Sequence, residues 1–346
     1  MTDNAALEYK SSLGKIHKNI IIQLCESGLD MSAPLADPRN ARWQKRVTDW
    51  LGAAATVWIW SYTSMHSILP NVNHWTVGED ITNLAKLGVK GYFAEGDGTP
   101  AKDLLLHYII GRKSFDPSLS TNETIREFLV PYYGNAAAAD LIFKYYDLMA
   151  IAYRDAPTVN STWPPNDRDR GDHHPLDYAR PNSSAYPSRT VLEAGELLVK
   201  ATAAVAGSPS GVERIMELRL SISYLALLRW DDIKSFATAH KLGWPFAASK
   251  RAAFESFSQV LTSNWGDAGW LGQAPLVSRG NPQCDLTCFK TQLFGNTSTN
   301  PPMKLDDNDN DDDDDGSFKQ FKSWEVAKPL KSDGSGSMLQ VPRSSV

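Results

Sequence analysis

The pattern of apolar and polar positions predicts an alternating strand and helix region at the start of the chain. Largely apolar runs at residues 20–24, 56–60 and 89–94 predict three strands, and the first is rich in β-branched side chains. Between them, residues 42–51 and 78–87 carry apolar side chains at helical spacing. Strand, helix, strand, helix and strand in this order is typical of a parallel sheet or a (β/α) barrel.

After Gly98 the pattern becomes helical. Apolar stripes predict helices at residues 103–112, 120–133, 136–153 and 246–263, and residues 156–188, rich in Pro, Asp, Asn and Arg, predict an irregular loop. Three Ser/Thr-x-x-Glu sequences predict capping boxes at helix N-termini. They are Ser120 with Glu123, Thr190 with Glu193, and Ser210 with Glu213.

These patterns predict an α/β fold in three parts. Residues 1–100 form the last three or four strands of a (β/α)8, TIM-like barrel, with residues 5–9 as the remnant of a further strand. Residues 101–295 form an α-helical region, and residues 296–346 a disordered acidic tail. The tail has no apolar periodicity and contains an Asp-rich run at 306–315, so it cannot bury enough surface to offset its chain entropy.

Composition excludes some classes of partner and leaves the compartment open. The net charge is −5 with no basic stripe, so nucleic acid is not an expected partner, and no run of about 20 apolar residues exists to span a membrane. The first residues lack the basic and apolar regions of a secretory signal. Three cysteines define no disulfide framework, and the oligomeric state cannot be read from the sequence.

Carboxylates follow two of the predicted strands. Glu26 ends the first, and Glu95 and Asp97 end the third, where glycines at 96 and 98 allow close backbone approach to a ligand. Polar groups at the carboxyl ends of parallel strands are how a (β/α) barrel builds a sugar site. Glycoside hydrolysis needs two carboxyl groups, so Glu95 is the candidate acid/base and Glu26 and Asp97 are candidate sugar ligands. The alternative for Glu95 is a helix cap or an ion pair with Lys102.

Aromatic side chains accompany these carboxylates. Trp60 and Tyr62 flank the end of the second strand and form a candidate sugar platform, although core packing is the alternative for Trp60, and Trp58 is expected to be buried. His66 lies in the following loop as a candidate substrate ligand. Neither a metal nor a cofactor is expected: His173 and His174 beside Asp172 lie in a Pro-rich loop, and phosphate-loop and zinc-protease motifs are missing from the sequence.

Four segments together resemble a known family. They are Asn-Ile-Ile-Ile-Gln-Leu at 19–24, Val-Trp-Ile-Trp-Ser-Tyr at 57–62 with Leu-Pro-Asn at 69–71, Gly-Val-Lys-Gly-Tyr-Phe-Ala-Glu-Gly at 88–96, and Glu-Phe-Leu-Val-Pro-Tyr-Tyr-Gly-Asn-Ala-Ala at 127–137. In this order and spacing, residues 5–155 resemble the "domain of unknown function 4838" family, which is related to glycoside hydrolases, alpha-glucuronidases among them.

The resemblance implies a carbohydrate partner and a glycoside-hydrolase-like activity on a barrel of about 250 residues. Because only three or four strands are predicted here, we expect an N-terminally truncated chain or one completed by a partner. Truncation would also remove a signal peptide, which favours secretion in that case. Three functions stay open: a glycoside hydrolase, a non-catalytic carbohydrate-binding module, and an inactive truncated fragment.

Overall fold

The computed structural model describes residues 16–26, 29–61, 63, 70, 72–94, 100–155, 186–265 and 286–295. All of them belong to one compact unit, residues 1–299, and residues 300–346 form a second unit. The predicted disordered tail and the predicted strand at 5–9 lie outside the described residues.

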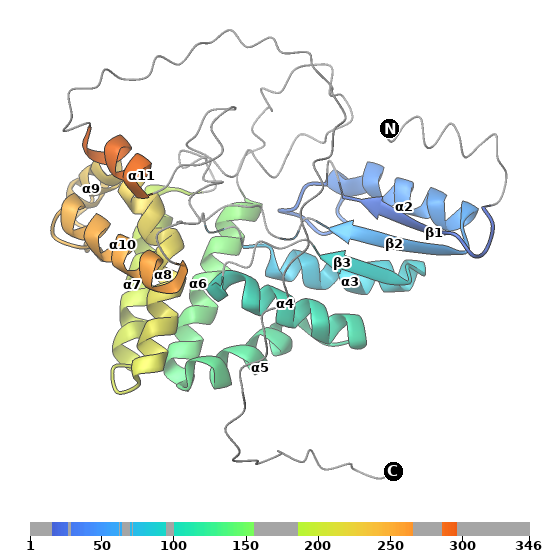
Figure 1. Cartoon of the computed structure of the whole chain (residues 1–346), viewed down its shortest axis with the longest axis horizontal. Coiled ribbons are helices and arrows are strands. Elements are labelled where there is room, and N and C mark those ends of the chain that lie inside the picture. Colours follow the sequence, from blue (N-terminus) through green and yellow to red (C-terminus); the bar gives the residue numbers. More distant parts are fainter. Residues whose placement is uncertain are drawn as a thin grey trace, which may run out of the picture. The chain divides into compact units, whose positions relative to one another are not determined.

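A parallel three-stranded sheet forms the first part of the fold. Its strands are β1 (Ile21–Cys25), β2 (Thr56–Ser61) and β3 (Gly91–Ala94), in the order β1-β2-β3. The short 3-10 helix η1 (Pro38–Asn40) and helix α2 (Ala41–Ala53) connect β1 to β2, and helix α3 (His74–Leu87) connects β2 to β3 (Figure 1). The predicted strand–helix–strand–helix–strand order is therefore confirmed.

Both crossover helices cover the same face of the sheet. Leu24 of β1 and Val57 and Ile59 of β2 are buried in one cluster with Val47 of α2 and Leu84 of α3. Sequential strand order with crossovers of one hand places successive helices on one side, as in a (β/α) barrel. Gly88 ends α3 in the left-handed conformation, φ 100°, and so turns the chain into β3.

The strand arrangement differs from the predicted barrel. The fold class is α/β, with a small parallel sheet and mostly helices, and no TIM barrel is evident among the three strands that the structure describes. Periodicity along the sequence identifies each strand but carries no information on closure, which depends on strands that pair far from the local sequence.

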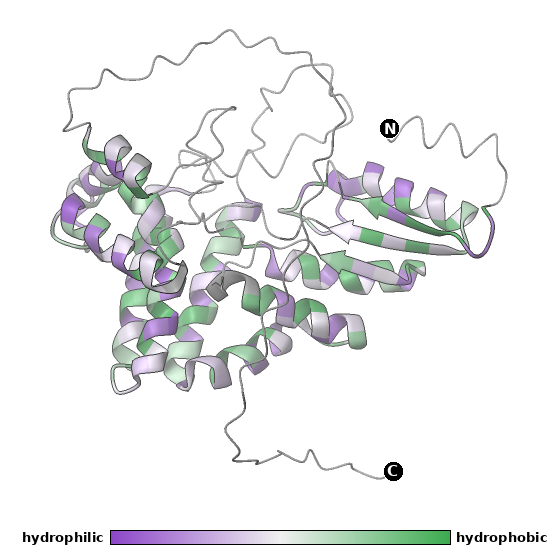
Figure 2. Ribbon diagram, viewed as in Figure 1, coloured by the Kyte–Doolittle hydropathy of each residue, from purple (hydrophilic) through white to green (hydrophobic). Residues whose placement is uncertain are grey.

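Helices form the rest of the described chain. They are α4 (Pro100–Phe115), α5 (Thr121–Tyr133), α6 (Ala136–Arg154), α7 (Ser188–Ala204), α8 (Pro209–Leu228), α9 (Trp230–Ala239), α10 (Lys250–Trp265) and α11 (Leu286–Phe294). None of the described helices is long and apolar enough to cross a membrane. Along these helices apolar and polar residues alternate in short groups rather than in long apolar runs (Figure 2).

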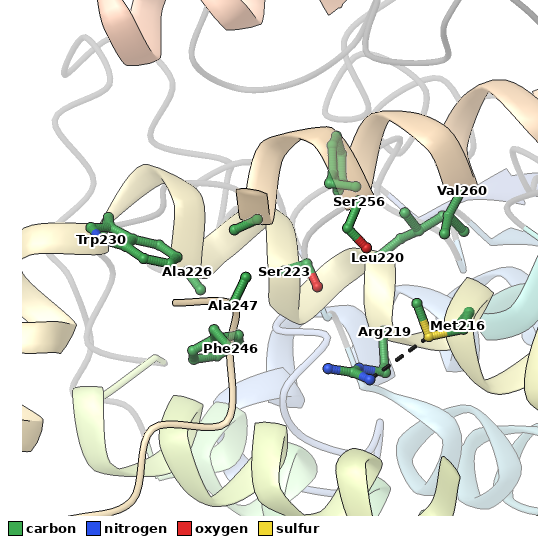
Figure 3. A pocket seen from close by; sticks show the side chains of 12 residues that line it. Met216, Arg219, Leu220, Ser223, Ala226, Trp230, Phe246, Ala247, Ser256 and Val260 are labelled. Atoms are coloured by element: carbon green, nitrogen blue, oxygen red, sulfur yellow. Dashed lines mark hydrogen bonds between the residues drawn. The ribbon is translucent and has the colours of Figure 1, made fainter. Parts of the chain in front are cut away.

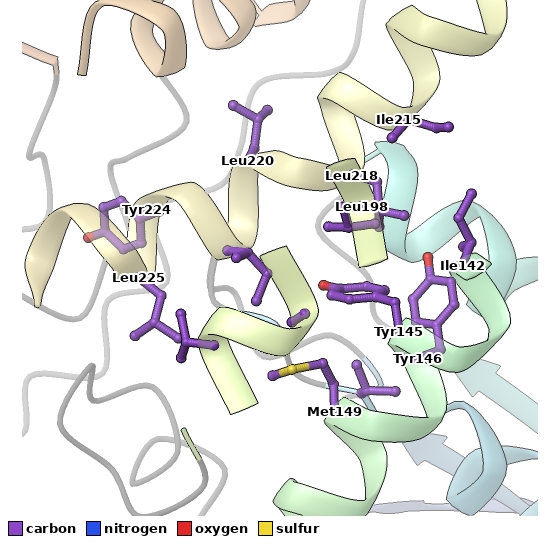
Figure 4. Packing of buried hydrophobic residues seen from close by; sticks show 14 of the residues in the cluster. Ile142, Tyr145, Tyr146, Met149, Leu198, Ile215, Leu218, Leu220, Tyr224 and Leu225 are labelled. Atoms are coloured by element: carbon purple, nitrogen blue, oxygen red, sulfur yellow. The ribbon is translucent and has the colours of Figure 1, made fainter. Parts of the chain in front are cut away.

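The core of the helical region lies between α6, α7 and α8. Tyr145, Tyr146 and Met149 of α6 are at most 1% exposed, and Leu198 of α7 and Leu218 of α8 belong to the same buried cluster (Figure 4). Aromatic rings fill much of this core: Tyr145 and Tyr146 are 5.2 Å apart by their centroids. Burial of such large side chains is the main source of stability in this region.

Helix starts agree with the sequence in one of three cases. Ser120 caps α5 as predicted, with its hydroxyl accepting from the Glu123 amide. The other two boxes are wrong, because α7 begins at Ser188 and α8 is capped by Ser208, whose hydroxyl accepts from the Gly211 amide. Pro209 occupies the first turn of α8, where its missing N–H costs nothing, so the helix starts earlier than the predicted box.

Candidate functional site

The face of the sheet opposite α2 and α3 exposes large apolar side chains. Ile21 of β1 is 51% exposed, Trp58 of β2 is 39% exposed and Phe93 of β3 is 45% exposed. The prediction that Trp58 is buried is wrong, because alternation along β2 directs it away from the side that both crossover helices cover. We call Trp58, Trp60 and Phe93 the aromatic face.

The indole of Trp58 lies over the backbone of β3. Trp58 pairs with Gly91 in the parallel register, and a Cβ added at Gly91 would come within 2.4 Å of the indole Cδ2 and 2.6 Å of Cε2. Only a glycine at this position leaves room for a ring that lies so close to the neighbouring strand. With Trp58 39% exposed, part of the residue remains accessible to solvent.

Trp60 continues the aromatic face toward the carboxyl end of β2. It pairs with Phe93, and the two rings meet edge to face, with centroids 5.1 Å apart and an interplanar angle of 74°. Trp60 is half-buried, in keeping with both roles that the sequence left open for it. The structure describes Glu26, which is also predicted for the site. The remaining predicted site residues lie outside the described residues: Tyr62, His66, Glu95 and Asp97.

Glu26 lies on the other side of the sheet, at the carboxyl end of β1. Its amide donates to the Trp60 carbonyl at 2.8 Å, which extends the pairing of β1 with β2, and its side chain is buried. Ser61 hydrogen-bonds to the Glu26 carboxyl and to the phenol of Tyr92. Burial raises the pKa of Glu26 from 4.5 to about 7, despite the opposing hydrogen bond from Ser61.

A second buried carboxyl group, Asp80 of α3, faces the same region. Burial raises its pKa well above the usual value, and the negative charge of Glu26 raises it further, against a hydrogen bond from the Leu35 amide at 2.5 Å. Burial is also the main reason that the pKa of Tyr92 is raised, with Glu26 adding to it. We call Glu26, Asp80, Ser61 and Tyr92 the buried carboxyl cluster.

Sequence reasoning missed Asp80. The available signal is its position within α3: Val77, Ile81 and Leu84 form the apolar stripe of this helix, and Asp80 lies three residues after Val77 and four before Leu84. A carboxylate within an apolar stripe is costly to bury unless it is protonated or hydrogen-bonded, and this marks it as a residue with a specific role.

Asn40 holds the segment that follows β1. Its side-chain oxygen accepts from the Asp30 amide at 2.8 Å, and its amide nitrogen donates to the carbonyls of Asp30, Ala33 and Pro34 at 2.9–3.1 Å. Asp30 in turn accepts from the amide and hydroxyl of Ser32. The segment between β1 and η1 is therefore fixed by buried hydrogen bonds rather than by apolar packing alone.

A cavity of about 320 Å³ lies between this segment, α3 and α6. Its polar lining comes from Ser32, Thr76, Glu79, Asp147 and Arg154, and Trp75 contributes an aromatic wall. The indole N–H of Trp75 donates to Asn122, so that ring is held in place. Ligands of α/β proteins commonly bind outside the carboxyl ends of parallel strands, which makes this cavity a second candidate site beside the aromatic face.

No cluster of three or more His, Cys, Asp or Glu side chains suited to a metal ion occurs in the part of the chain that the structure describes. The sequence pair His173 and His174 lies outside it.

The fold and these sites define an α/β protein with a small parallel sheet, an exposed aromatic face and a buried carboxyl cluster, followed by a helical region. Residues 9–147 match the family model of a domain of unknown function (DUF4838), in agreement with the resemblance found in the sequence. No curated protein and no solved structure gives a match to this chain.

Proposed function

We propose that the protein is a carbohydrate-active protein that binds a sugar on the aromatic face. The observation that carries the proposal is the position of Trp58, whose indole lies against Gly91 while the residue stays 39% exposed. A pyranose presents a patch of C–H groups on one side of its ring, and such a patch stacks on a flat, exposed indole.

An exposed apolar surface of this kind requires a reason. Large aromatic side chains dominate the energetics of binding surfaces, and contiguous exposed apolar patches mark interaction sites. Trp58, Trp60 and Phe93 lie on paired positions of neighbouring strands, so a rigid sheet holds them in place without loss of side-chain entropy on binding. A rigid aromatic surface without a basic stripe favours a neutral ligand such as an oligosaccharide.

Hydrolysis of the bound sugar is the second part of the proposal, with Glu95 as the acid/base group. Glu95 directly follows Ala94, the last residue of β3. The alternative is a non-catalytic carbohydrate-binding module. It is supported by the position of Glu26 and Asp80, because these carboxyl groups lie on the side of the sheet that α2 and α3 cover, away from a sugar on the aromatic face. Hydrolysis requires two carboxyl groups that flank the scissile glycosidic bond, one to protonate the leaving oxygen and one to attack the sugar or activate water.

Binding is tested first, with a panel of soluble oligosaccharides titrated into the full chain by calorimetry. Trp58→Ala is expected to weaken binding about tenfold. Stacking on a single aromatic ring contributes about 1.5 kcal/mol, and about 1.4 kcal/mol corresponds to a factor of ten in the dissociation constant. Phe115→Ala is the matched control, because Phe115 is an exposed aromatic residue, 88% accessible, at the end of α4. Equal affinity of the Trp58 variant and the wild type contradicts the proposal.

Catalysis is tested separately with aryl glycosides of the sugars that bind. If the protein is a hydrolase, Glu95→Gln abolishes turnover and leaves binding on the aromatic face intact. If the wild type binds oligosaccharide but releases no aryl alcohol from any of these substrates, the carbohydrate-binding module is the correct alternative.

A further inference from the structure

A cavity of about 60 Å³ lies in the helical region, remote in sequence from the aromatic face. It is bounded by α8, α9 and α10 and by residues 246–247, which precede α10 (Figure 3). Leu220 of α8, Phe246, and Phe257 and Val260 of α10 form its apolar walls. Its polar lining consists of Arg219, Ser223 and Ser256.

Arg219 is the unusual member of this lining. Its guanidinium donates to the Met216 sulfur at 3.7 Å, which is a weak acceptor (Figure 3). Burial lowers the pKa of Arg219, and no carboxylate among the described residues forms an ion pair with it. A guanidinium carries five N–H donors, and among the described residues the Met216 sulfur is the acceptor that one of them reaches.

Other half-buried arginines of the same region are satisfied. Arg229 pairs with Asp232 and donates to the Ser188 hydroxyl at 3.0 Å, and Arg214 donates to the Tyr132 carbonyl. Arg219 is half-buried, so its guanidinium is partly removed from water with no charged partner among the described residues, and such a group favours an anion.

Two hydroxyl groups supplement the charge. Ser223 lies one helical turn after Arg219 on α8, so both side chains lie on the same side of that helix, and Ser256 faces them from α10. Figure 3 shows Ser223 and Arg219 beside the same space, with Leu220 and Val260 next to it. A cation, two hydroxyl donors and apolar walls suit a carboxylate that carries a small apolar body.

The size of the cavity restricts that ligand further. One water molecule needs about 10–15 Å³ of such volume, so 60 Å³ holds about four to six water-sized groups. A polysaccharide, a long acyl chain or an aromatic carboxylate does not fit inside, whereas a short-chain carboxylate such as propionate does. We propose that this cavity binds a small monocarboxylate with an apolar body, with Arg219 as the group that recognises the carboxylate.

Propionate is the probe, titrated into the full chain by calorimetry, with 1-propanol and sulfate as the two comparison ligands. Wild type is expected to bind propionate more tightly than either, since 1-propanol lacks the charge and sulfate lacks the apolar body. Arg219→Gln is expected to weaken propionate binding about tenfold or more, because a hydrogen bond to a charged group contributes more than one between neutral groups. Ser223→Ala is expected to weaken it by a smaller factor.

Arg189→Gln is the matched control, since Arg189 is 54% exposed on α7, and this variant should bind propionate as the wild type does. The proposal is overturned if wild type binds no propionate at millimolar concentration, if sulfate binds as tightly, or if Arg219→Gln and Ser223→Ala both keep wild-type affinity. A far-ultraviolet circular dichroism spectrum identical to that of wild type confirms that each variant is folded. This site shares no residue with the aromatic face, so its failure leaves the sugar proposal untouched.

Discussion

The indole of Trp58 rests on Gly91 of the neighbouring strand, and each of the two residues requires the other. The ring atoms Cδ2, Cε2 and Cγ occupy positions 2.4–2.6 Å from where a Cβ of residue 91 would be. Backbone freedom is not the reason for the glycine, since Gly91 is absent from the described positive-φ residues. Space for the indole is the reason.

Gly91→Ala is therefore expected to displace the Trp58 ring and destabilise the sheet. Overpacking at such a contact costs about 1–3 kcal/mol, measurable as a lower midpoint of urea unfolding. Gly111→Ala is the control, because Gly111 lies within α4 with nothing within 4 Å of an added Cβ. That variant should gain about 0.5–1 kcal/mol from helix propensity. Equal effects of the two substitutions would show that Trp58 does not lie against β3.

The raised pKa of Glu26 predicts that stability falls as pH rises. In the folded protein this carboxyl keeps its proton up to about pH 7, whereas in the unfolded chain it loses the proton near 4.5. The protonated carboxyl contributes its full stabilisation below the unfolded pKa, and this contribution is lost as the pH rises through the folded pKa. At about 1.4 kcal/mol per pH unit, the total loss in the free energy of unfolding is about 3 kcal/mol. Urea unfolding at about pH 5 and about pH 8 measures this difference.

Glu26→Gln isolates the contribution of this residue. At about pH 8 the variant should be more stable than the wild type, because the amide keeps a partner for Ser61 and carries no charge, and at about pH 5 the two should be similar. The remaining pH dependence of the variant comes from Asp80, whose pKa is raised in the same direction. If wild type and variant respond equally to pH, Glu26 is not buried in the described way.

Asn40→Ala should be among the most destabilising polar substitutions in the first part of the fold. It removes the hydrogen bonds that the Asn40 side chain forms with the Asp30 amide and with the carbonyls of Asp30, Ala33 and Pro34. Loss of such buried bonds costs about 2–4 kcal/mol. Thermal unfolding checks this, and Asn122→Ala, which removes one exposed bond from Trp75, should cost much less.

Tyr224→Phe is expected to leave stability unchanged or to increase it by up to about 1 kcal/mol. The ring of Tyr224 is fully buried and packs 4.9 Å from the ring of Phe289, but its hydroxyl has no hydrogen-bond partner among the described residues. Removing an unsatisfied polar atom costs nothing, whereas Tyr224→Ala would cost about 3–5 kcal/mol through the cavity that it leaves. A clear loss of stability in the Phe variant would indicate a partner for this hydroxyl.

The sequence predicted the strands well and their surroundings less well. β-branched and aromatic runs identify β1, β2 and β3 directly. Which face of the sheet stays open depends on the side on which both crossover helices pack, and the sequence pattern does not give that side. Burial of Trp58 is therefore a wrong expectation from the sequence. No separate helix is predicted at α9, because apolar residues continue across Arg229, from Leu228 to Trp230. Asp80 is identified as a site residue only by its contact with the Leu35 amide and its proximity to Glu26 in the folded protein. Local periodicity in the sequence does not reveal such tertiary contacts.

The central claim is that sugar binds at Trp58, and indole N–H resonances in a ¹H–¹⁵N spectrum test it most directly. The chain contains 11 tryptophans, and each gives one such signal. On titration with an oligosaccharide that binds, we predict shifts of Trp58 and Trp60, with Trp75 in the cavity near α6 and Trp244 in the helical region unchanged. Shifts of Trp75 in place of Trp58, or no shift with any oligosaccharide of the panel, would contradict the account.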